Sequence, residues 1–385
     1  MDRIYLDNAA STPLDPEVFE YMKPFFVDFP GNPSSTHAFG RDQRSAIEQA
    51  RRLIAKLIKA KPYEIYFTSG GTEADNLAIM GSVQQGVKHI ITTAIEHHAV
   101  THPVEHLEAA GEVTVTWLKV NRQGDIDLRE LEQALEQHPN ALVCLMHGNN
   151  EIGTVYDLVA IGELCRQYGA RFHSDTVQTM GNFELDLSAL PVDFITASAH
   201  KFNGPKGVGF LFVRKGVKLT PLIQGGSQEQ NLRAGTENMP SIVGMAKALE
   251  KAYGHLEAKQ SHLWELKNYL KEALKNAFPG VEFNGRQEPE SALPGVLNVS
   301  FPHQEDLMLL FNLDLAGVAA SAGSACNSGA LLGSHVLREL GASQGSILNT
   351  IRFSFGMQNT KEEIDRAVEA LRAILSDKVP LGQVD

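Results

Sequence analysis

Between residues 65 and 213 the chain alternates short apolar runs with stretches of helix-like periodicity, and this alternation restricts the possible folds more than any other feature. Strands that alternate with helices favour an α/β domain with a mainly parallel sheet. Ligands of such sheets bind beyond the carboxyl ends of the strands, so polar residues at those ends are the first candidates for a site. We expect seven strands, at 65–67, 88–93, 113–118, 141–147, 171–175, 193–198 and 208–213, and helices at 73–80, 97–110, 127–137 and 157–168.

The pattern changes after about residue 239. A long helical region continues to Ala277 and stops at Pro279 and Gly280. The remaining sequence predicts a smaller α+β domain, with strands at 296–301, 317–321 and 350–355 and helices at 305–315 and after Thr360. We expect a large domain at 15–257 and a small domain formed by 1–14 together with 258–385.

Composition excludes several classes of protein. The chain has 385 residues, is 43% hydrophobic and carries a net charge of −12, without a block of Lys and Arg. These features argue against nucleic acid or an anionic membrane as the main partner. The segment Met1–Asp7 does not read as a signal peptide, and no apolar run approaches the length of a membrane span. Three cysteines provide no disulfide framework, so we expect a reduced, cytoplasmic protein.

Two of the expected strands end in residues that carry chemistry. Asp175 ends one strand, and Lys201 closely follows another, with Ser198 and His200 beside it. A lysine and an aspartate placed in this way are typical of proteins that hold pyridoxal phosphate. The amine bonds to the cofactor aldehyde, and the carboxylate keeps the pyridine nitrogen protonated. A solvated turn aspartate and a surface lysine are the plainer alternatives.

A Gly-rich turn, Ser69–Glu73, joins a strand to a helix. Gly71 lets the backbone approach a ligand closely, Thr72 adds a hydroxyl, and the start of the helix presents N–H groups to an anion. The turn lacks the Gly-Lys-Ser/Thr of a nucleotide-binding P-loop. An ordinary strand–helix turn, capped by Thr72, is the alternative.

Three more residues follow strands and suit a planar cofactor. His97 can lie on the cofactor face and act as an acid or a base. Asn150 and Gln178 can hydrogen-bond a phenolic oxygen, although amides at strand ends are also common in turns.

A histidine stripe in the following helix mimics a metal site. His98, His102 and His106 are spaced by four, but Pro103 interrupts the stripe. No carboxylate or cysteine completes a ligand set, so we expect a solvated face rather than a metal.

Two residues of the C-terminal region are candidates for substrate chemistry. Cys326 lies in a loop of small residues, which suits a nucleophile that must reach a substrate, whereas an incidental thiol is the alternative. Cys144 and Cys165 lie in apolar patterns and are expected to be buried. Arg352 ends an apolar strand and needs a partner, either a substrate carboxylate or a structural ion pair.

Taken in order, these segments strongly resemble the cysteine desulfurases of the NifS/IscS type, within the class V branch of fold-type I pyridoxal-phosphate enzymes. The resemblance runs nearly end to end, although Met357 stands where many relatives have a basic residue. It is carried by Tyr5–Pro13, Gly31–His37, Thr68–Asn76, Glu96–His97, Asn149–Gly153, His173–Gln178, Ser198–Gly207, Arg233–Asn238, Gly323–Cys326 and Ile351–Ser354.

The resemblance implies a homodimer that uses pyridoxal phosphate and L-cysteine. Lys201 would bond to the cofactor, Asp175 would pair with its ring nitrogen, and His97 would stack on its ring. Cys326 would take the sulfur as a persulfide and leave L-alanine. Asn150 and Gln178 would contact the phenolic oxygen, and Arg352 and Asn150 would bind the substrate carboxylate. The residues that would contact the phosphate are Gly71, Thr72, Ser198, His200 and the other subunit's Thr236.

The resemblance also implies a sulfur-acceptor protein, such as an iron–sulfur scaffold or a tRNA-thiolation protein. Iron would meet Cys326 only through its persulfide, at a transient shared cluster. A related pyridoxal-phosphate aminotransferase or selenocysteine lyase is one alternative, and Cys326 is the residue that discriminates it. A non-catalytic assembly platform is the other, and the presence of both Lys201 and Cys326 argues against it.

Overall fold

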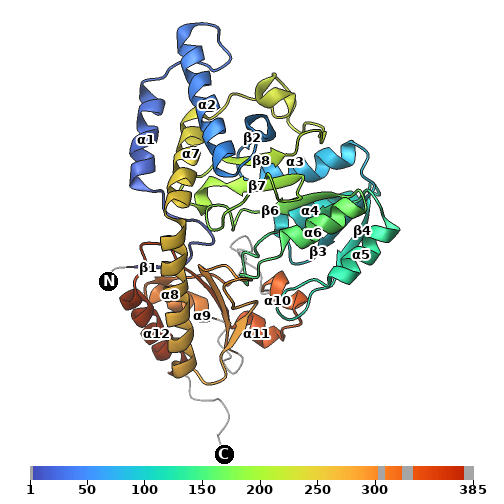
Figure 1. Ribbon diagram of the computed structural model, residues 1–385. Helices are drawn as coiled ribbons and strands as arrows, with labels where there is room; N and C mark the ends of the chain where they lie inside the picture. The colour runs from blue at the N-terminus through green and yellow to red at the C-terminus, as the bar shows by residue number, and fades with distance from the viewer. Residues whose placement is uncertain (1–2, 302–307, 323–332, 377–385) are drawn as a thin grey trace, which may run out of the picture.

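The computed structural model describes residues 3–301, 308–322 and 333–376. Figure 1 shows a large α/β part and a smaller part below it, with helix α8 (Leu256–Ala277) running beside the smaller sheet. No helix in the described ranges is long and apolar enough to cross a membrane.

The large part is built on a seven-stranded sheet, as the sequence predicts. Strand β8 is antiparallel to both of its neighbours, and the other pairs are parallel. The order across the sheet is β2 (Ile65–Thr68), β8 (Gly209–Val213), β7 (Phe194–Ser198), β6 (Arg171–Asp175), β5 (Leu142–Cys144), β3 (His89–Thr93) and β4 (Thr114–Leu118).

Helices cover both faces of this sheet because successive strand residues point to opposite sides. Ile90 packs in the apolar cluster of the helices on one face, and Ile91 packs in the cluster of those on the other. The first face carries α3 (Gly71–Gln84) and α4 (His98–Ala109); the second carries α2 (Ala38–Leu57), α5 (Leu128–Gln137), α6 (Leu158–Gln167) and α7 (Met239–Gly254).

The smaller part has its own apolar cluster. Its antiparallel sheet has the order β12 (Thr350–Ser354), β10 (Val296–Ser300) and β9 (Glu282–Asn284). Strand β1 (Ile4–Tyr5) pairs in parallel with β11 (Val318–Ala319), which ties the start of the chain to this part. The cluster is covered by α8, α9 (Leu309–Leu315) and α12 (Lys361–Ser376).

Several elements differ from the sequence prediction. The long helical region is two helices, because α7 ends at Gly254 and α8 begins at Leu256, with His255 outside helical geometry between them. The strands expected at 141–147 and 317–321 are shorter. The sequence interpretation missed α1 (Pro16–Val27), α10 (His335–Glu339) and α11 (Gln344–Leu348), the last two being only five residues long.

Candidate active site

A cavity of about 250 Å³ opens at the carboxyl ends of β6 and β7. Such an edge is where α/β sheets bind ligands, because loops rather than paired strands line it. The cavity brings together ten residues that the sequence singled out: Gly71, Thr72, His97, Asn150, Asp175, Gln178, Ser198, His200, Lys201 and Arg352.

Two predicted residues are not part of this lining. Thr236 is exposed, in the loop that leads to α7. Cys326 lies outside the described residues.

Lys201 is held by the N-terminal segment. It lies in a short 3-10 turn directly after β7, and its Nζ atom donates to the carbonyl oxygens of Ala9 at 2.6 Å and Ala10 at 3.0 Å. The backbone of Thr12 also donates to the carbonyl of His200. The start of the chain therefore aims the lysine at the cavity, a contact that no local pattern in the sequence predicts.

Asp175 is a buried acid rather than a solvated turn residue. Its side chain is buried, and Oδ1 accepts a hydrogen bond from the backbone of Val177 at 2.8 Å. Burial, reinforced by the nearby charge of Asp75, raises the pKa of Asp175 to about 7. A cationic group placed in the cavity would relieve this cost.

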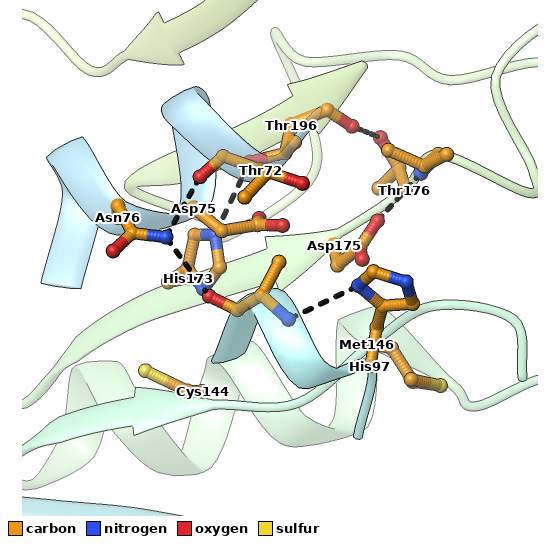
Figure 2. Close-up of polar contacts among 12 residues, drawn as sticks. Thr72, Asp75, Asn76, His97, Cys144, Met146, His173, Asp175, Thr176 and Thr196 are labelled. Atoms are coloured by element: carbon orange, nitrogen blue, oxygen red, sulfur yellow. Dashed lines mark hydrogen bonds and ion pairs between the residues drawn. The ribbon is translucent and has the colours of Figure 1, made fainter. Parts of the chain in front are cut away.

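Asp75 is a functional candidate that the sequence interpretation missed. It lies one helical turn after Thr72, lines the same cavity and is 1% exposed. Burial raises the pKa of Asp75 to about 7. Figure 2 shows its carboxylate between His173 and Asp175, with Thr72 on the same helix. The sequence signal was an acid within the mostly apolar helix that follows the Gly-rich turn.

His97 begins α4 as its cap. The backbone of Ala99 donates to Nδ1 of His97 at 3.1 Å, which fixes the ring at the cavity (Figure 2). Burial and then the charge of Lys201 lower the pKa of His97 to about 4. The imidazole is therefore neutral at pH 7, and because Nδ1 accepts from Ala99, the ring carries its proton on Nε2.

Glu96, beside His97, is a second functional candidate that the sequence interpretation missed. It is 1% exposed, and its carboxyl group accepts hydrogen bonds from the backbone of Met146 at 2.9 Å and from Thr93 at 3.2 Å. Burial raises the pKa of Glu96 well above its usual value. Its contacts fasten the His97 loop to the end of β5.

The Gly-rich turn opens a helix start towards the cavity. No side chain caps α3, because its N-cap residue is Gly70, with φ +155°. A side chain at Gly71 would approach Val177 to 2.9 Å, so only glycine fits there without displacement. The helix dipole and backbone N–H groups of such a start favour an anion. Thr72 therefore sits in the first turn and is not the cap that the plainer alternative required.

The neighbouring His200 is also neutral at pH 7. Burial, followed by the charges of Lys201 and Lys206, lowers the pKa of His200 to about 4. Its Nδ1 lies 3.3 Å from the Ser11 hydroxyl, so the ring is held at the cavity by the N-terminal segment.

The two amides meet the cavity in different ways. Gln178 donates from Nε2 to the carbonyl of Ala9 at 3.0 Å. Asn150 offers its backbone oxygen to Arg352 at 2.9 Å while its residue lines the cavity.

Arg352 forms a structural ion pair, one of the two alternatives that the sequence left open, and it also faces the cavity. Its guanidinium group pairs with Asp7 at 2.8 Å and is 2% exposed, so a structural ion pair exists. The residue also lines the cavity, and its Nε atom has no hydrogen-bond partner within the described part of the chain. Asp7 therefore orients a cation that faces the site.

No metal centre forms within the described ranges, where no group of three or more His, Cys, Asp or Glu side chains could hold an ion. His98 and His102 stack at 4.4 Å between ring centroids, as their spacing implies.

The other two cysteines are poor nucleophiles. Cys144 and Cys165 are buried, and burial raises the pKa of the Cys144 thiol well above its usual value and that of Cys165 to about 12.

The described residues fit pyridoxal phosphate. A lysine amine, a buried acid that needs a cation and an uncapped helix start all face one cavity. They match the cofactor's aldehyde, ring nitrogen and phosphate. Fold and site together define a pyridoxal-phosphate enzyme of fold type I.

Comparison with known proteins defines the family. The Aminotransferase class-V family matches residues 4–367. A cysteine desulfurase IscS of Dictyoglomus turgidum is 45% identical over 375 residues, which cover 97% of this chain and 94% of the relative. The chain belongs to the class-V aminotransferase family, in its NifS/IscS branch.

Solved structures agree with this assignment. A NifS-like protein has a TM-score of 0.90 at 36% identity, and the match covers 98% of this chain and all of that one. A structure described as SspA in complex with cysteine has a TM-score of 0.79 at 34% identity, covering 93% of this chain and all of that one.

Proposed function

We propose that the protein is a cysteine desulfurase. It would convert L-cysteine to L-alanine while the thiol of Cys326 becomes a persulfide. In this transfer the C–S bond of the substrate breaks, an S–S bond forms on Cys326, and Cβ of the product gains a proton. The observation that carries the proposal is the cavity shared by Lys201, Asp175, His97 and Arg352, in a chain 45% identical to a cysteine desulfurase.

The roles proposed for the residues follow from their contacts. When bound, pyridoxal phosphate supplies an electron sink that makes the substrate's Cα–H and Cβ–S bonds labile. Asp175, ionised by a cation beside it, would hold the ring nitrogen protonated. Lys201 would bond to the cofactor and, once released, move the Cα proton. His97, neutral at pH 7 with its proton on Nε2, would lie against the ring and donate a hydrogen bond from Nε2 to the ligands.

The remaining contacts would orient the two ligands. Arg352, aimed by Asp7, would bind the substrate carboxylate, with Asn150 beside it. Asn150 and Gln178 would hold the phenolic oxygen. The phosphate would be held by Gly71, Thr72, Ser198, His200 and the Thr236 of a second subunit.

We propose a homodimer on two grounds. Thr236 is exposed and outside the lining of its own chain's cavity, which fits a residue that serves a second subunit. Exposed aromatic residues also gather on α1 and at the start of α2, with Phe26 62% and Phe39 61% exposed. Burial of such a patch is a usual reason for association.

The destination of the sulfur is part of the proposal. An acceptor protein, such as an iron–sulfur scaffold or a tRNA-thiolation protein, would take the persulfide in the cytoplasm. Contact with iron would be limited to a transient cluster at Cys326. The division into domains 15–257 and 1–14 with 258–385 is likewise proposed, supported by separate apolar clusters and the pairing of β1 with β11.

Mass spectrometry after one turnover with L-cysteine tests the function. We expect alanine in equal amount to a persulfide on Cys326. Cys326→Ser should abolish both, whereas Cys165→Ser, the matched control, should retain both because that thiol is buried. Transamination without persulfide would favour an aminotransferase. Inertness towards cysteine, despite bound cofactor, would favour a lyase for selenocysteine or an assembly platform.

A further inference from the structure

Helix α10 of the smaller part packs directly on the two loops that carry His97 and Asn150. Val336, Leu337 and Leu340 form one apolar cluster with Ile95 and Ile152. Ile95 lies two residues before His97, and Ile152 lies two residues after Asn150. The helix therefore connects the His97 loop with the Asn150 loop, although α10 lies far from both along the sequence.

Polar contacts at the start of α10 reach still closer to the site. The Ser334 hydroxyl donates to the Glu151 carboxylate, and Ser334 also caps α10 by accepting from the backbone of Leu337 at 3.1 Å. Glu151 is 0% exposed, so its carboxylate depends on such partners.

The imidazole of His335 lies against the sequence neighbours of His97 and of Asn150. Its Nε2 atom lies 3.1 Å from the Glu96 carbonyl oxygen, and its ring lies 4.4 Å from that of His98. Its Nδ1 atom lies 3.9 Å from the Glu151 carboxylate. Glu96 and His98 flank His97, and Glu151 follows Asn150, so one side chain connects the loops on both sides of the cavity.

The tautomer of His335 follows from these contacts. A carbonyl oxygen accepts only, so Nε2 must carry a proton. The Nδ1 atom faces the Glu151 carboxylate at 3.9 Å and has no hydrogen-bond partner among the described residues. The groups that face the ring are Glu151, the backbone of Glu96 and the imidazole of His98, on which His102 stacks.

We propose that His335 is a positioning residue for the cofactor site, acting through His97 and Asn150, and that Ser334, which contacts the same Glu151 carboxylate, assists it. Beside His97 it holds the backbone through the Glu96 carbonyl, and beside Asn150 it faces the side-chain carboxylate of Glu151. This inference rests on the proposed cofactor site and is independent of the substrate and of Cys326.

The test compares His335→Leu, His335→Gln and the unaltered enzyme. The readouts are the dissociation constant for pyridoxal phosphate added to apoprotein, the visible spectrum of the bound cofactor, and kcat with L-cysteine. Loss of the Glu96 contact in His335→Leu should weaken cofactor binding about three- to tenfold, shift the cofactor spectrum and lower kcat. His335→Gln, whose side-chain amide can still donate to the Glu96 carbonyl, should restore binding to within about twofold.

His102→Leu is the matched control, because His102 lies in the same stack but on the exposed side of α4. It should behave as the unaltered enzyme. If His335→Leu does not fold, Ser334→Ala, which removes the Glu151 contact, should show the same spectral shift.

Two results would overturn the inference: an unchanged cofactor constant and spectrum in His335→Leu, or equal impairment of the Leu and Gln variants. If the unaltered protein bound no pyridoxal phosphate, the proposed function itself would fail. Failure of the proposed function is thus distinguishable from failure of the role proposed for His335.

Discussion

Nε2 of His173 lies 3.1 Å from the Asp75 carboxylate, and each side chain is 1% exposed. Burial lowers the pKa of His173 to about 4 and raises the pKa of Asp75 to about 7. Although the distance is that of an ion pair, both groups are mostly neutral between these values. The contact is therefore a hydrogen bond beside Asp175 that adds no full charge until Asp75 ionises.

Asp75→Asn should lower the pKa of Asp175. Burial is the first cause of that raised pKa and the charge of Asp75 the second, so removing the charge leaves burial as the only cause that raises it. Because Asp75 carries its charge only around and above pH 7, Asp175 should then ionise more completely in that range, and apoprotein should bind pyridoxal phosphate more tightly there. Cofactor affinity measured between pH 5 and 8 checks this shift. A profile identical to that of the unaltered protein would contradict coupling between the two acids.

Asp175→Asn should stabilise the apoprotein at pH 8 while it severely lowers turnover. The folded-state pKa of Asp175, about 7, lies above its usual 3.8. The stability that Asp175 contributes in its protonated form is thus fully present below pH 3.8 and is lost as the pH rises to 7. Asparagine avoids this loss, so the gain in unfolding free energy should reach up to about 4 kcal/mol at pH 8 and vanish near pH 4.

Denaturant unfolding of both apoproteins at the two pH values measures this gain. Equal stability at pH 8 would show that Asp175 is not a strained buried acid. Near-normal turnover by the variant would contradict its proposed role at the ring nitrogen.

Asp7→Asn should raise KM for L-cysteine more than it lowers kcat. Asp7 holds the Arg352 guanidinium at 2.8 Å, and a loosened guanidinium should bind a carboxylate less well. We expect KM to rise about three- to tenfold, the effect of one charge-assisted hydrogen bond.

Asp125→Asn is the control for that variant. Asp125 pairs with Arg286 at the same distance of 2.8 Å but lies outside the cavity lining. Its steady-state constants should not change. A rise in KM for both variants would indicate a general loss of stability rather than loss of carboxylate binding.

Lys201→Ala should abolish turnover, because Lys201 is the only amine among the described residues that line the cavity. Borohydride reduction of the unaltered holoenzyme should fix the cofactor on Lys201. Lys206→Ala, with an exposed side chain five residues away, is the control and should retain activity. Cofactor found on Lys206 after reduction would refute the assignment.

The sequence by itself determined the layered α/β fold and most of the cavity. Period-two and period-3.6 patterns are local, so the seven strands and the helices between them could be predicted from neighbouring residues. Polar residues at the ends of parallel strands must meet at one edge of the sheet, and this rule is enough to place Asp175, Ser198 and Lys201 close together.

Only the tertiary structure decided how those residues are held. Lys201 depends on carbonyl groups of Ala9 and Ala10, and Arg352 depends on Asp7, although each pair is separated by more than 190 positions along the chain. Buried acids such as Asp75 and Glu96 acquire their raised pKa values from the packing around them. Short elements such as α10 carry too few residues for a periodic signal. Contacts over such separations follow from packing of whole elements, which no local pattern encodes.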